Sequence, residues 1–296
     1  MDPARAVIRD ARPSDLSRVY EIAYENATRD DPAPPPNPGF FADIQHEFHA
    51  GRMVVAERAG MVWGYASSVA RGRIVFLSSL FIAPSRQSSG LGRALLEALR
   101  PPAPLVFCTD SSSDPRAVAL YIQAGMRPRW PLFYLRGPAV QRDLASPALE
   151  TRVADAGDPE LARWDAEISG RARPMDHAFW IAEERAIPLW FSRGGSPVGY
   201  GYVRLGAGTL HESGAAVLGP IGARTASDAR ACVLAAVHWA AQRAPTLRID
   251  VLGPHPVLEP LLAAGFLIID QDIFMAGRGR LGFDPRRYIP SGGSLF

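Results

Sequence analysis

The segment around residues 80–96 carries the residues whose types and spacing most clearly suggest chemistry. An apolar stretch, Leu80–Ala83, ends at a proline, and a polar loop with Gly90 and Gly92 leads into an amphipathic stretch over residues 93–99. Main-chain amides at the start of a helix point into one concavity, and the positive end of the helix dipole helps them to bind anions. Glycines let the main chain approach such a ligand closely. The segment therefore predicts an anion site built from main-chain amides, which needs no lysine.

Two common nucleotide-binding motifs do not fit this segment. The dinucleotide fingerprint G-x-G-x-x-G would need a third glycine where Leu95 stands. A Walker A loop, a pyridoxal enzyme and a protein kinase all need a lysine, and the chain contains none. What remains is a strand, a proline and a polar loop with the spacing Q-x-x-G-x-G from Gln87 to Gly92, followed by a helix.

A second motif lies downstream, over Ser113–Met126, and predicts a helix that carries Tyr121 and ends at Gly125. The loop resembles the coenzyme A loop of the GNAT superfamily of N-acetyltransferases, and this helix resembles that superfamily's second signature, N-x-x-A-x-x-L-Y-x-x-x-G-F. Two such motifs in this order, with a predicted strand between them, are far more specific than a lone G-x-G. The resemblance covers residues 74–126.

The resemblance implies a set of site residues. The main chain of Leu80, Phe81 and Ile82 would pair with the pantetheine amides of coenzyme A like an added strand. Asp114 stands where the family usually has asparagine, which would weaken a contact to the pantetheine arm, and Tyr121 would protonate the departing thiolate. The residues of the implied diphosphate loop are Gln87, Ser88, Ser89, Gly90, Leu91, Gly92 and Arg93.

The implied reaction is direct attack of a neutral amine on the thioester of acetyl-CoA, with the oxyanion stabilised by a strand amide. A thiol has a reference pKa of about 8.5 and a tyrosine of about 10, so proton transfer from Tyr121 to the thiolate is feasible. An alternative is that Tyr121 is a core tyrosine with its hydroxyl hydrogen-bonded. Two residues of the predicted helix Phe40–His49, His46 and Glu47, would border the acceptor site. They are either a base or substrate contact, or ordinary polar residues of an amphipathic helix.

The elements that must position these residues alternate between strand and helix, with neighbouring hairpins, which is typical of a mixed α+β sheet. We expect two GNAT-like domains, each a mixed, mostly antiparallel sheet flanked by helices. The first covers residues 1–138 and the second, a degenerate copy, covers residues 148–280. A tail over residues 281–296 is rich in proline and glycine and is expected to pack on the surface without regular structure.

Weak self-similarity supports the duplication. Leu262–Phe266 echoes Ile122–Met126 at an offset of 140 residues, and Ala215–Pro220 echoes Ser79–Pro84. Leu261 stands at the position offset by 140 from Tyr121, and the G-x-G spacing is missing after Pro220. The sequence therefore predicts one active site per chain, in the first half.

Composition limits the remaining possibilities. The chain has 296 residues, with 32 basic and 30 acidic side chains and no basic stripe, which argues against a nucleic-acid partner. Cys108 and Cys232 stand far apart in apolar contexts, which predicts neither a disulfide framework nor a metal site. The charged N-terminus and the lack of a long apolar run predict a cytoplasmic protein without a membrane span. The arginine, alanine and proline bias suggests a bacterial, GC-rich genome.

The sequence as a whole predicts an N-acyltransferase that uses acetyl-CoA as co-substrate and no metal. The acceptor is an amine of a small molecule or a peptide, and a homodimer is possible. One alternative is a non-catalytic acyl-CoA-binding or regulatory protein, and another is a nucleotide-binding module. Turnover with a panel of amines would separate the enzyme from the binding protein, and thermal shifts with ATP or NAD would identify the nucleotide-binding module.

Overall fold

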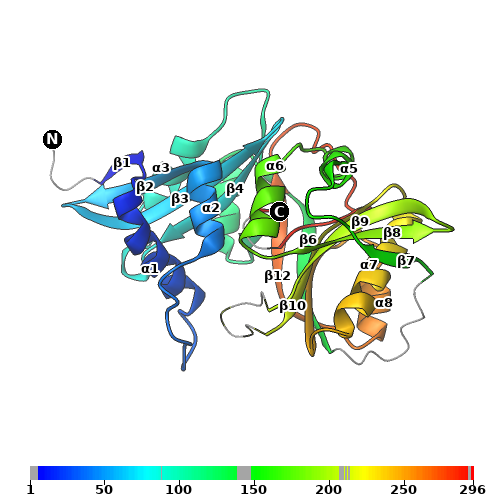
Figure 1. Ribbon diagram of the computed structural model, residues 1–296. Coiled ribbons are helices and arrows are strands. Elements are labelled where there is room, and N and C mark those ends of the chain that lie inside the picture. Colours follow the sequence, from blue (N-terminus) through cyan, green and yellow to red (C-terminus); the bar gives the residue numbers. More distant parts are fainter. Residues whose placement is uncertain are drawn as a thin grey trace. The chain divides into compact units, whose positions relative to one another are not determined.

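The structure is a computed structural model, and it describes residues 6–87, 89–138, 148–206, 210, 212, 214–292 and 295–296. By its internal contacts the chain divides into two compact units (Figure 1). Unit 1 holds the residues up to Thr109 together with Pro115–Arg127 and Ala276–Gly279. Unit 2 holds Asp110–Asp114, Pro128–Met275 and Arg280–Phe296.

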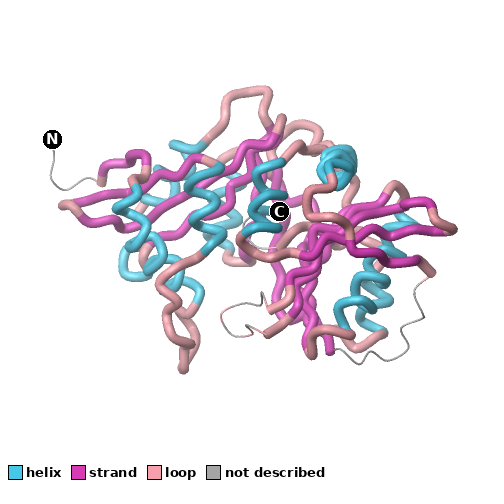
Figure 2. Tube along the Cα trace, viewed as in Figure 1, coloured by secondary structure: helices cyan, strands magenta, loops and turns pink. Residues whose placement is uncertain are grey.

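Unit 1 is a sheet with helices on both faces (Figure 2). Its strands run in the order β1-β2-β3-β4-β5, antiparallel from β1 to β4, with β4 and β5 parallel. The strands are β1 (Val7–Asp10), β2 (Arg52–Arg58), β3 (Met61–Arg71), β4 (Ile74–Ile82) and β5 (Val106–Ser112), of which residues 110–112 are grouped with unit 2. The helices are α1 (Leu16–Ala27), α2 (Ala42–Ala50), α3 (Leu91–Leu99) and α4 (Pro115–Gln123), with 3-10 turns η1 (Pro13–Asp15) and η2 (Pro84–Arg86).

The side-chain pattern of β2 explains why helices cover both faces of this sheet. Met53, Val54, Val55 and Ala56 are all buried, although successive side chains of a strand point to opposite faces. Met53 and Val55 belong to a core cluster with residues of α1 and α2. Helix α3 packs on β2, β3 and β4, and Figure 1 shows it on the other side of the sheet from α1 and α2.

Unit 2 has the same plan. Its strands run in the order β12-β6-β11-β10-β9-β8-β7, and β13 adds to β10 off this path. The pair β10–β11 is parallel, and β7–β8, β8–β9, β9–β10 and β6–β11 are antiparallel. The strands are β6 (Arg127–Pro138), β7 (Glu150–Val153), β8 (Ile187–Arg193), β9 (Ser196–Arg204), β10 (Ala216–Ala223), β11 (Thr246–Leu252), β12 (Leu267–Ala276) and β13 (Tyr288–Ile289). The helices are α5 (Pro159–Ser169), α6 (Pro174–Ala182), α7 (Ala226–Ala241) and α8 (Leu258–Ala263).

These two units confirm the expected α+β class with mixed, mostly antiparallel sheets flanked by helices. The expected domain boundary at residue 138 differs from the division by contacts. Strand β6 pairs with β11 from Leu132↔Leu252 to Pro138↔Thr246, so it completes the sheet of unit 2. An apolar strand pattern does not reveal which sheet the strand joins, because the pairing partner is remote in sequence. The residues between the two expected domains, 139–147, lie outside the described residues.

The ends of α4 and α8 confirm one of the two sequence echoes. The amide of Met126 donates to the Tyr121 carbonyl at 3.0 Å, and the amide of Phe266 donates to the Leu261 carbonyl at 3.0 Å. Gly125 and Gly265 both have a φ of 95°. Both helices therefore end in the same glycine-dependent cap, in which an amide reaches back five residues.

The other echo was wrong. Parallel pairing starts at Ile74↔Val106 in unit 1 and at Ala216↔Leu247 in unit 2, so Ile74 corresponds to Ala216. Ser79 therefore corresponds to Ile221 rather than to Ala215. Both strands carry a bulge just before these positions, and the offset of 142 residues is the same on either side of it.

The C-terminal segment also differs from expectation. We expected residues 281–296 to pack on the surface, but Tyr288 and Ile289 form β13 and are fully buried, and Phe296 is only 1% exposed. Burying apolar side chains of this size is favourable on folding, and Ile289 belongs to the main core cluster of unit 2.

In the described part of the chain, we find no helix that is both long enough and apolar enough to cross a membrane.

A buried histidine in unit 2 gives a prediction for the pH dependence of stability. His255 is 2% exposed, and burial lowers its pKa to about 4, although Asp284 acts in the opposite direction. Between pH 6.5 and pH 4 the unfolded chain takes up a proton that the folded chain refuses, so the free energy of unfolding falls as pH falls through this window. The expected loss from this group between pH 7 and pH 5 is about 2 kcal/mol.

Urea unfolding at pH 7 and pH 5 measures this effect, with His255→Asn as the comparison. In the wild type the Val257 amide donates a hydrogen bond to His255 Nδ1 at 3.3 Å. Asparagine cannot titrate, but its side-chain oxygen can accept this hydrogen bond. We expect the variant to lose less stability than the wild type between the two pH values. Equal losses in the two proteins would show that His255 does not stay neutral in the folded state.

Candidate functional site

The expected anion site forms at the start of α3. After β4 the chain makes the turn η2 (Pro84–Arg86), and Gly90 then precedes the helix with a φ of 82°. A residue with a side chain is strained at this φ, which explains a glycine at position 90. Ser89 and Gly90 are exposed, and Leu91 is buried against the sheet side of the helix. Ser88, one of the expected site residues, lies outside the described residues.

The first amides of α3 are left for an outside partner. The first three amides of a helix have no partner within it, and in α3 the amide of Ala94 is the first to bond back, to the Gly90 carbonyl at 3.2 Å. Among the described residues no side chain caps this end of the helix. The amides of Leu91, Gly92 and Arg93 and the helix dipole therefore favour an anion here.

Internal packing does not explain the glycine at position 92. A Cβ added to Gly92 would meet only Leu120, at 3.6 Å, and a Cβ added to Gly90 would meet nothing within 4 Å. A glycine inside a helix costs about 1 kcal/mol relative to alanine. Open space outside a costly glycine is what a ligand close to the main chain requires.

Side chains behind the loop hold it in place. Gln87 donates to Asn26 of α1 at 3.2 Å, and Asn26 donates to the Ile82 carbonyl at the end of β4 at 3.1 Å. The hydroxyl of Ser89 donates to the Arg86 carbonyl at 2.6 Å, and the Arg86 guanidinium stacks over Trp63 at 4.4 Å. The side chain of Gln87 thus fixes the loop to α1, a role that its spacing alone did not suggest.

The last part of β4 offers a free strand edge beside this loop. Strand β4 pairs with β5 only from Ile74 to Phe76, whereas it continues along β3 as far as Ile82. Among the described residues, no strand pairs with Ser79–Ile82 on the β5 side. Leu80 and Ile82 are half-buried, and Phe81 is 37% exposed. The three residues expected to bind pantetheine therefore lie on an accessible edge.

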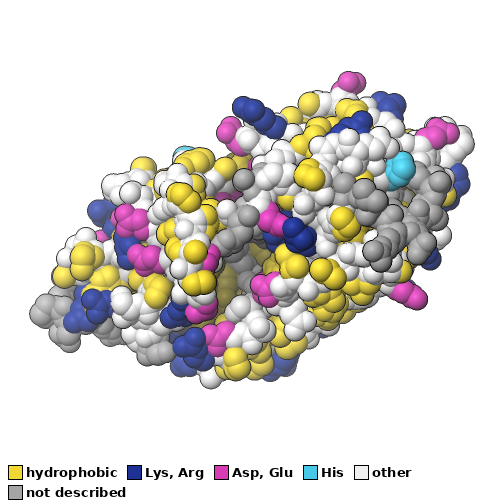
Figure 3. Space-filling model, turned by 90° about the horizontal axis from the view of Figure 1, so that it is seen from below, with side chains coloured by type: hydrophobic (Ala, Val, Ile, Leu, Met, Phe, Trp, Pro, Cys, Tyr) yellow, Lys and Arg dark blue, Asp and Glu magenta, His cyan; other side chains and the backbone are white. Residues whose placement is uncertain are grey.

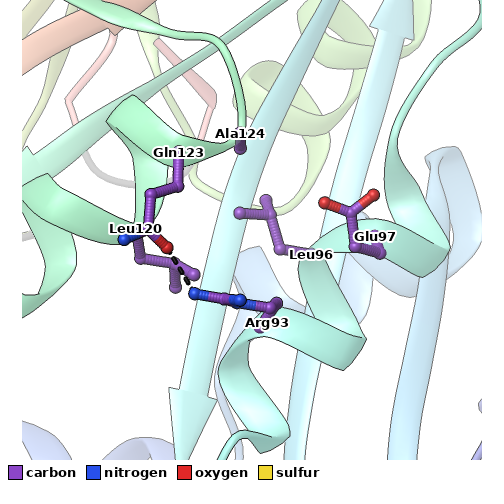
Figure 4. Close-up of a pocket in the computed structure, with 6 residues that line it drawn as sticks. All are labelled: Arg93, Leu96, Glu97, Leu120, Gln123 and Ala124. Atoms are coloured by element: carbon purple, nitrogen blue, oxygen red, sulfur yellow. Dashed lines mark hydrogen bonds between the residues drawn. The ribbon is translucent and has the colours of Figure 1, made fainter.

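Helix α4 packs next to α3 and bears Tyr121, which is 7% exposed. A pocket of about 360 Å³ lies between the two helices. Figure 4 shows Arg93 of α3 directed toward Gln123 of α4, to which it donates a hydrogen bond. Leu96, Glu97, Leu120 and Ala124 complete its lining. Asp114, the residue before α4, belongs to the short stretch Asp110–Asp114 that is grouped with unit 2.

Glu47 is a buried carboxylate close to the point where β4 leaves β5. It is fully buried on α2, and it accepts hydrogen bonds from the hydroxyls of Ser67 on β3 and Ser79 on β4, the latter at 2.9 Å. The sequence left open whether Glu47 is a base or an ordinary helix residue. In this structure its carboxylate ties α2 to both strands and has no surface in contact with solvent. The neighbouring His46 is 9% exposed.

Unit 2 has no counterpart of the loop. The connection from strand to helix takes residues 83–90 in unit 1 but only Arg224 and Thr225 in unit 2. The Thr225 hydroxyl accepts from the Asp228 amide at 3.0 Å, and the Asp228 carboxylate accepts from Thr225 and from Arg193. This helix start is therefore capped by the chain's own side chains, and an acidic residue stands where an anion would bind.

In the described ranges, no group of three or more histidine, cysteine, aspartate or glutamate side chains is arranged to hold a metal ion.

Comparison with known proteins agrees with this geometry. Residues 16–126 match the model of the acetyltransferase (GNAT) family. This region is a GNAT domain. The matched region contains α1, the loop, α3 and α4, which are the elements of the site. The region that carries the candidate site therefore resembles the acetyltransferases of the GNAT family, and the sequence matches none of the curated proteins.

Solved structures extend the likeness in fold to the whole chain. A proposed acetyltransferase from Pyrococcus horikoshii has a TM-score of 0.77 at 14% identity, covering 99% of this chain and 96% of that one. A GCN5-related N-acetyltransferase from Sphaerobacter thermophilus has a TM-score of 0.59 at 15% identity, with coverages of 94% and 99%. A tandem GNAT protein from the clavulanic acid biosynthesis pathway has a TM-score of 0.62 at 14% identity, with coverages of 93% and 100%. The chain therefore shares its fold with these proteins, one of which is a tandem GNAT protein.

Proposed function

We propose that unit 1 transfers an acetyl group from acetyl-CoA to an amine by direct attack. The single observation that carries this proposal is the uncapped start of α3, where Gly92 leaves space outside the main chain that no internal contact uses. The diphosphate of the donor would accept hydrogen bonds from the amides of this helix start. Gln87 would support the loop through Asn26, and Arg93 at the edge of the hollow would add a positive charge.

The pantetheine arm would lie along the free edge of β4. Its two amide groups can pair with the main chain of Leu80, Phe81 and Ile82 in the manner of an added strand. The thioester would then lie near the point where β4 and β5 separate, and a β4 amide would stabilise the oxyanion.

The acetyl group would pass directly from the thioester to the amine, without a covalent acyl-enzyme. The amine nitrogen forms a bond to the thioester carbonyl carbon, the carbon–sulfur bond breaks, and the electron pair leaves with sulfur. The thiolate takes a proton, which we assign to the hydroxyl of Tyr121. The proton that the attacking nitrogen loses passes to solvent, and solvent returns a proton to the Tyr121 oxygen. The products are an N-acetylated acceptor and free coenzyme A.

Tyr121→Phe tests this role. The variant keeps the ring that packs in α4 and loses the acidic proton, so we expect coenzyme affinity within about twofold of the wild type and turnover lowered by about 100-fold. Release of free thiol with a panel of small-molecule and peptide amines measures turnover.

Unchanged turnover in Tyr121→Phe would leave Tyr121 as a core tyrosine and remove its acid role. Tight coenzyme binding by the wild type without turnover on any amine would favour the non-catalytic acyl-CoA-binding protein. Tyr134→Phe on β6 serves as the matched control because it makes the same chemical change in unit 2.

We further propose that one donor binds per chain, because the short connection before α7 leaves no loop for a second diphosphate. The acceptor class, the possible homodimer, and the cytoplasmic and bacterial setting stay predictions. The same is true of the expected lack of nucleic-acid and membrane partners. Figure 3 shows acidic and basic side chains interspersed over the described part of the face it presents.

A further inference from the structure

The end of the chain occupies a gap in the sheet of unit 2. Strands β10 and β11 pair in parallel from Ala216 to Leu218 of β10 and then separate, while β10 continues to Ala223. On the side that β11 has left, β13 pairs with β10 through Ile221↔Ile289 and Gly222↔Tyr288. The contact continues with the Ala223 amide, which donates to the Arg287 carbonyl at 3.1 Å.

This gap is the counterpart of the free edge in unit 1. The register of the parallel pairs makes Ser79 and Leu80 of β4 equivalent to Ile221 and Gly222 of β10. In unit 1 this stretch is the edge on which our proposed function places the pantetheine arm. In unit 2 a peptide segment of the same chain pairs with the same stretch.

Beyond β13 the segment enters a site lined by two arginines. The main-chain oxygen of Phe296 accepts from Arg173 at 2.7 Å and from Arg171 at 3.0 Å. The Phe296 ring stacks on Phe274 at 4.7 Å and meets the ring of Phe283 at 5.4 Å. The Ser291 carbonyl accepts from Arg204.

The two arginines lie in a buried network of hydrogen bonds. Asp165 receives two hydrogen bonds from Arg173, at 2.7 and 2.8 Å, and one from Tyr200 at 2.5 Å. The Arg173 guanidinium also donates to the Tyr288 hydroxyl at 2.6 Å. Arg173 is 2% exposed and Asp165 is fully buried. The ion pair keeps a charged donor inside unit 2, where it hydrogen-bonds the main-chain oxygen of Phe296.

Close main-chain contact shows that β10 is shaped for this segment. Gly219, with a φ of 142°, leaves no room for a Cβ because the carbonyl of Pro290 lies against it. A Cβ on Gly292 would come within 3.0 Å of the Asp250 carboxylate. The site therefore fits an extended peptide whose Tyr288 and Phe296 side chains are buried.

We propose that unit 2 is a peptide-binding module whose groove is occupied by residues 288–292 and 295–296 of its own chain, in the position that the acyl donor takes in unit 1. The equivalence with the donor rests on the proposed function, whereas the peptide site rests on the contacts of unit 2 alone. The ligand class is an extended peptide with an aromatic side chain beside a main-chain oxygen held by Arg171 and Arg173.

The test uses the full chain with a protease recognition sequence inserted between Arg280 and Leu281. Arg280 is exposed, and insertions are best tolerated at exposed loops. After folding and cleavage, we expect the segment to stay bound through gel filtration and to exchange slowly with a fluorescent peptide of residues 281–296. A peptide with Phe296→Ala should compete about 30-fold less well or worse. A chain cleaved at the exposed Gly194–Gly195 turn controls for nicking.

Loss of the segment on gel filtration with an unchanged unfolding temperature would overturn the proposal. Equal competition by the wild-type and Phe296→Ala peptides would overturn it as well. Acetyl-CoA titration of the same cleaved protein reports on unit 1 separately. Failure to bind acetyl-CoA there would contradict the proposed function and leave the peptide result unaffected.

Discussion

Gly92→Glu is expected to abolish binding of coenzyme A while the chain stays folded. The carboxylate would stand at the start of α3, where the diphosphate is proposed to bind, and two like charges about 4 Å apart repel by about 4 kcal/mol at an effective dielectric constant near 20. This energy corresponds to a loss of affinity of about 1,000-fold. The same substitution replaces a helical glycine and places an anion at the positive end of the helix, so stability should rise by about 1 kcal/mol.

Calorimetric titration with acetyl-CoA measures the affinity and the number of sites. We expect one site per chain in the wild type and none in Gly92→Glu. Gly92→Gln is the matched control, since it has nearly the same size without the charge and should bind more tightly than the glutamate variant. Wild-type affinity in Gly92→Glu would place the diphosphate elsewhere, and two sites in the wild type would contradict the degenerate second domain.

Asp165→Asn is expected to lower the free energy of unfolding more than any of the other substitutions proposed for this chain. Burial by itself would raise the pKa of Asp165, but the charge and hydrogen bonds of Arg173 and the hydrogen bond of His177 hold it far below its usual range. Asparagine would leave the buried guanidinium without a counter-charge and place an amide among donors. Breaking a buried ion pair in this way costs about 3–5 kcal/mol.

Chemical unfolding of Asp165→Asn at pH 7 measures this cost. Asp155→Asn makes the same chemical change at an exposed position of unit 2 and should stay within about 0.5 kcal/mol of the wild type. A loss below about 1 kcal/mol in Asp165→Asn would show that Arg173 finds another partner and that the ion pair is not needed.

Local patterns in the sequence predicted the loop, the helix after it and Tyr121. Each rests on short-range spacing: Gly90 must adopt positive φ next to a helix start, and Gly125 and Gly265 end their helices in the same way. The family resemblance then supplied the coenzyme A assignment, which spacing alone left open. This is why the match over residues 16–126 agrees with the motif region.

Features that depend on distant pairing were missed. Strand β6 follows unit 1 in sequence but pairs with β11, and only the three-dimensional register shows this. The short sequence similarity between Ser79–Pro84 and Ala215–Pro220 placed the two halves six residues out of register, because Ser79 corresponds to Ile221. The support that Asn26 gives to the loop could not be predicted, because it depends on a hydrogen bond with Gln87, which lies 61 residues away in the sequence. In the C-terminal segment, the aromatic residues Tyr288 and Phe296 among prolines and glycines indicated that the segment packs against the protein. They did not indicate that these side chains are buried inside unit 2.

The central claim is that main-chain amides at the start of α3 hold the diphosphate of the donor. The most direct test records the backbone amide resonances of glycine-labelled protein by NMR with and without acetyl-CoA, with Gly90 and Gly92 assigned through single substitutions. The account predicts that the Gly92 proton moves downfield on binding, as an amide that donates to phosphate does, while the glycines of unit 2 such as Gly222 stay unchanged. An unmoved Gly92 resonance in protein saturated with acetyl-CoA would contradict it.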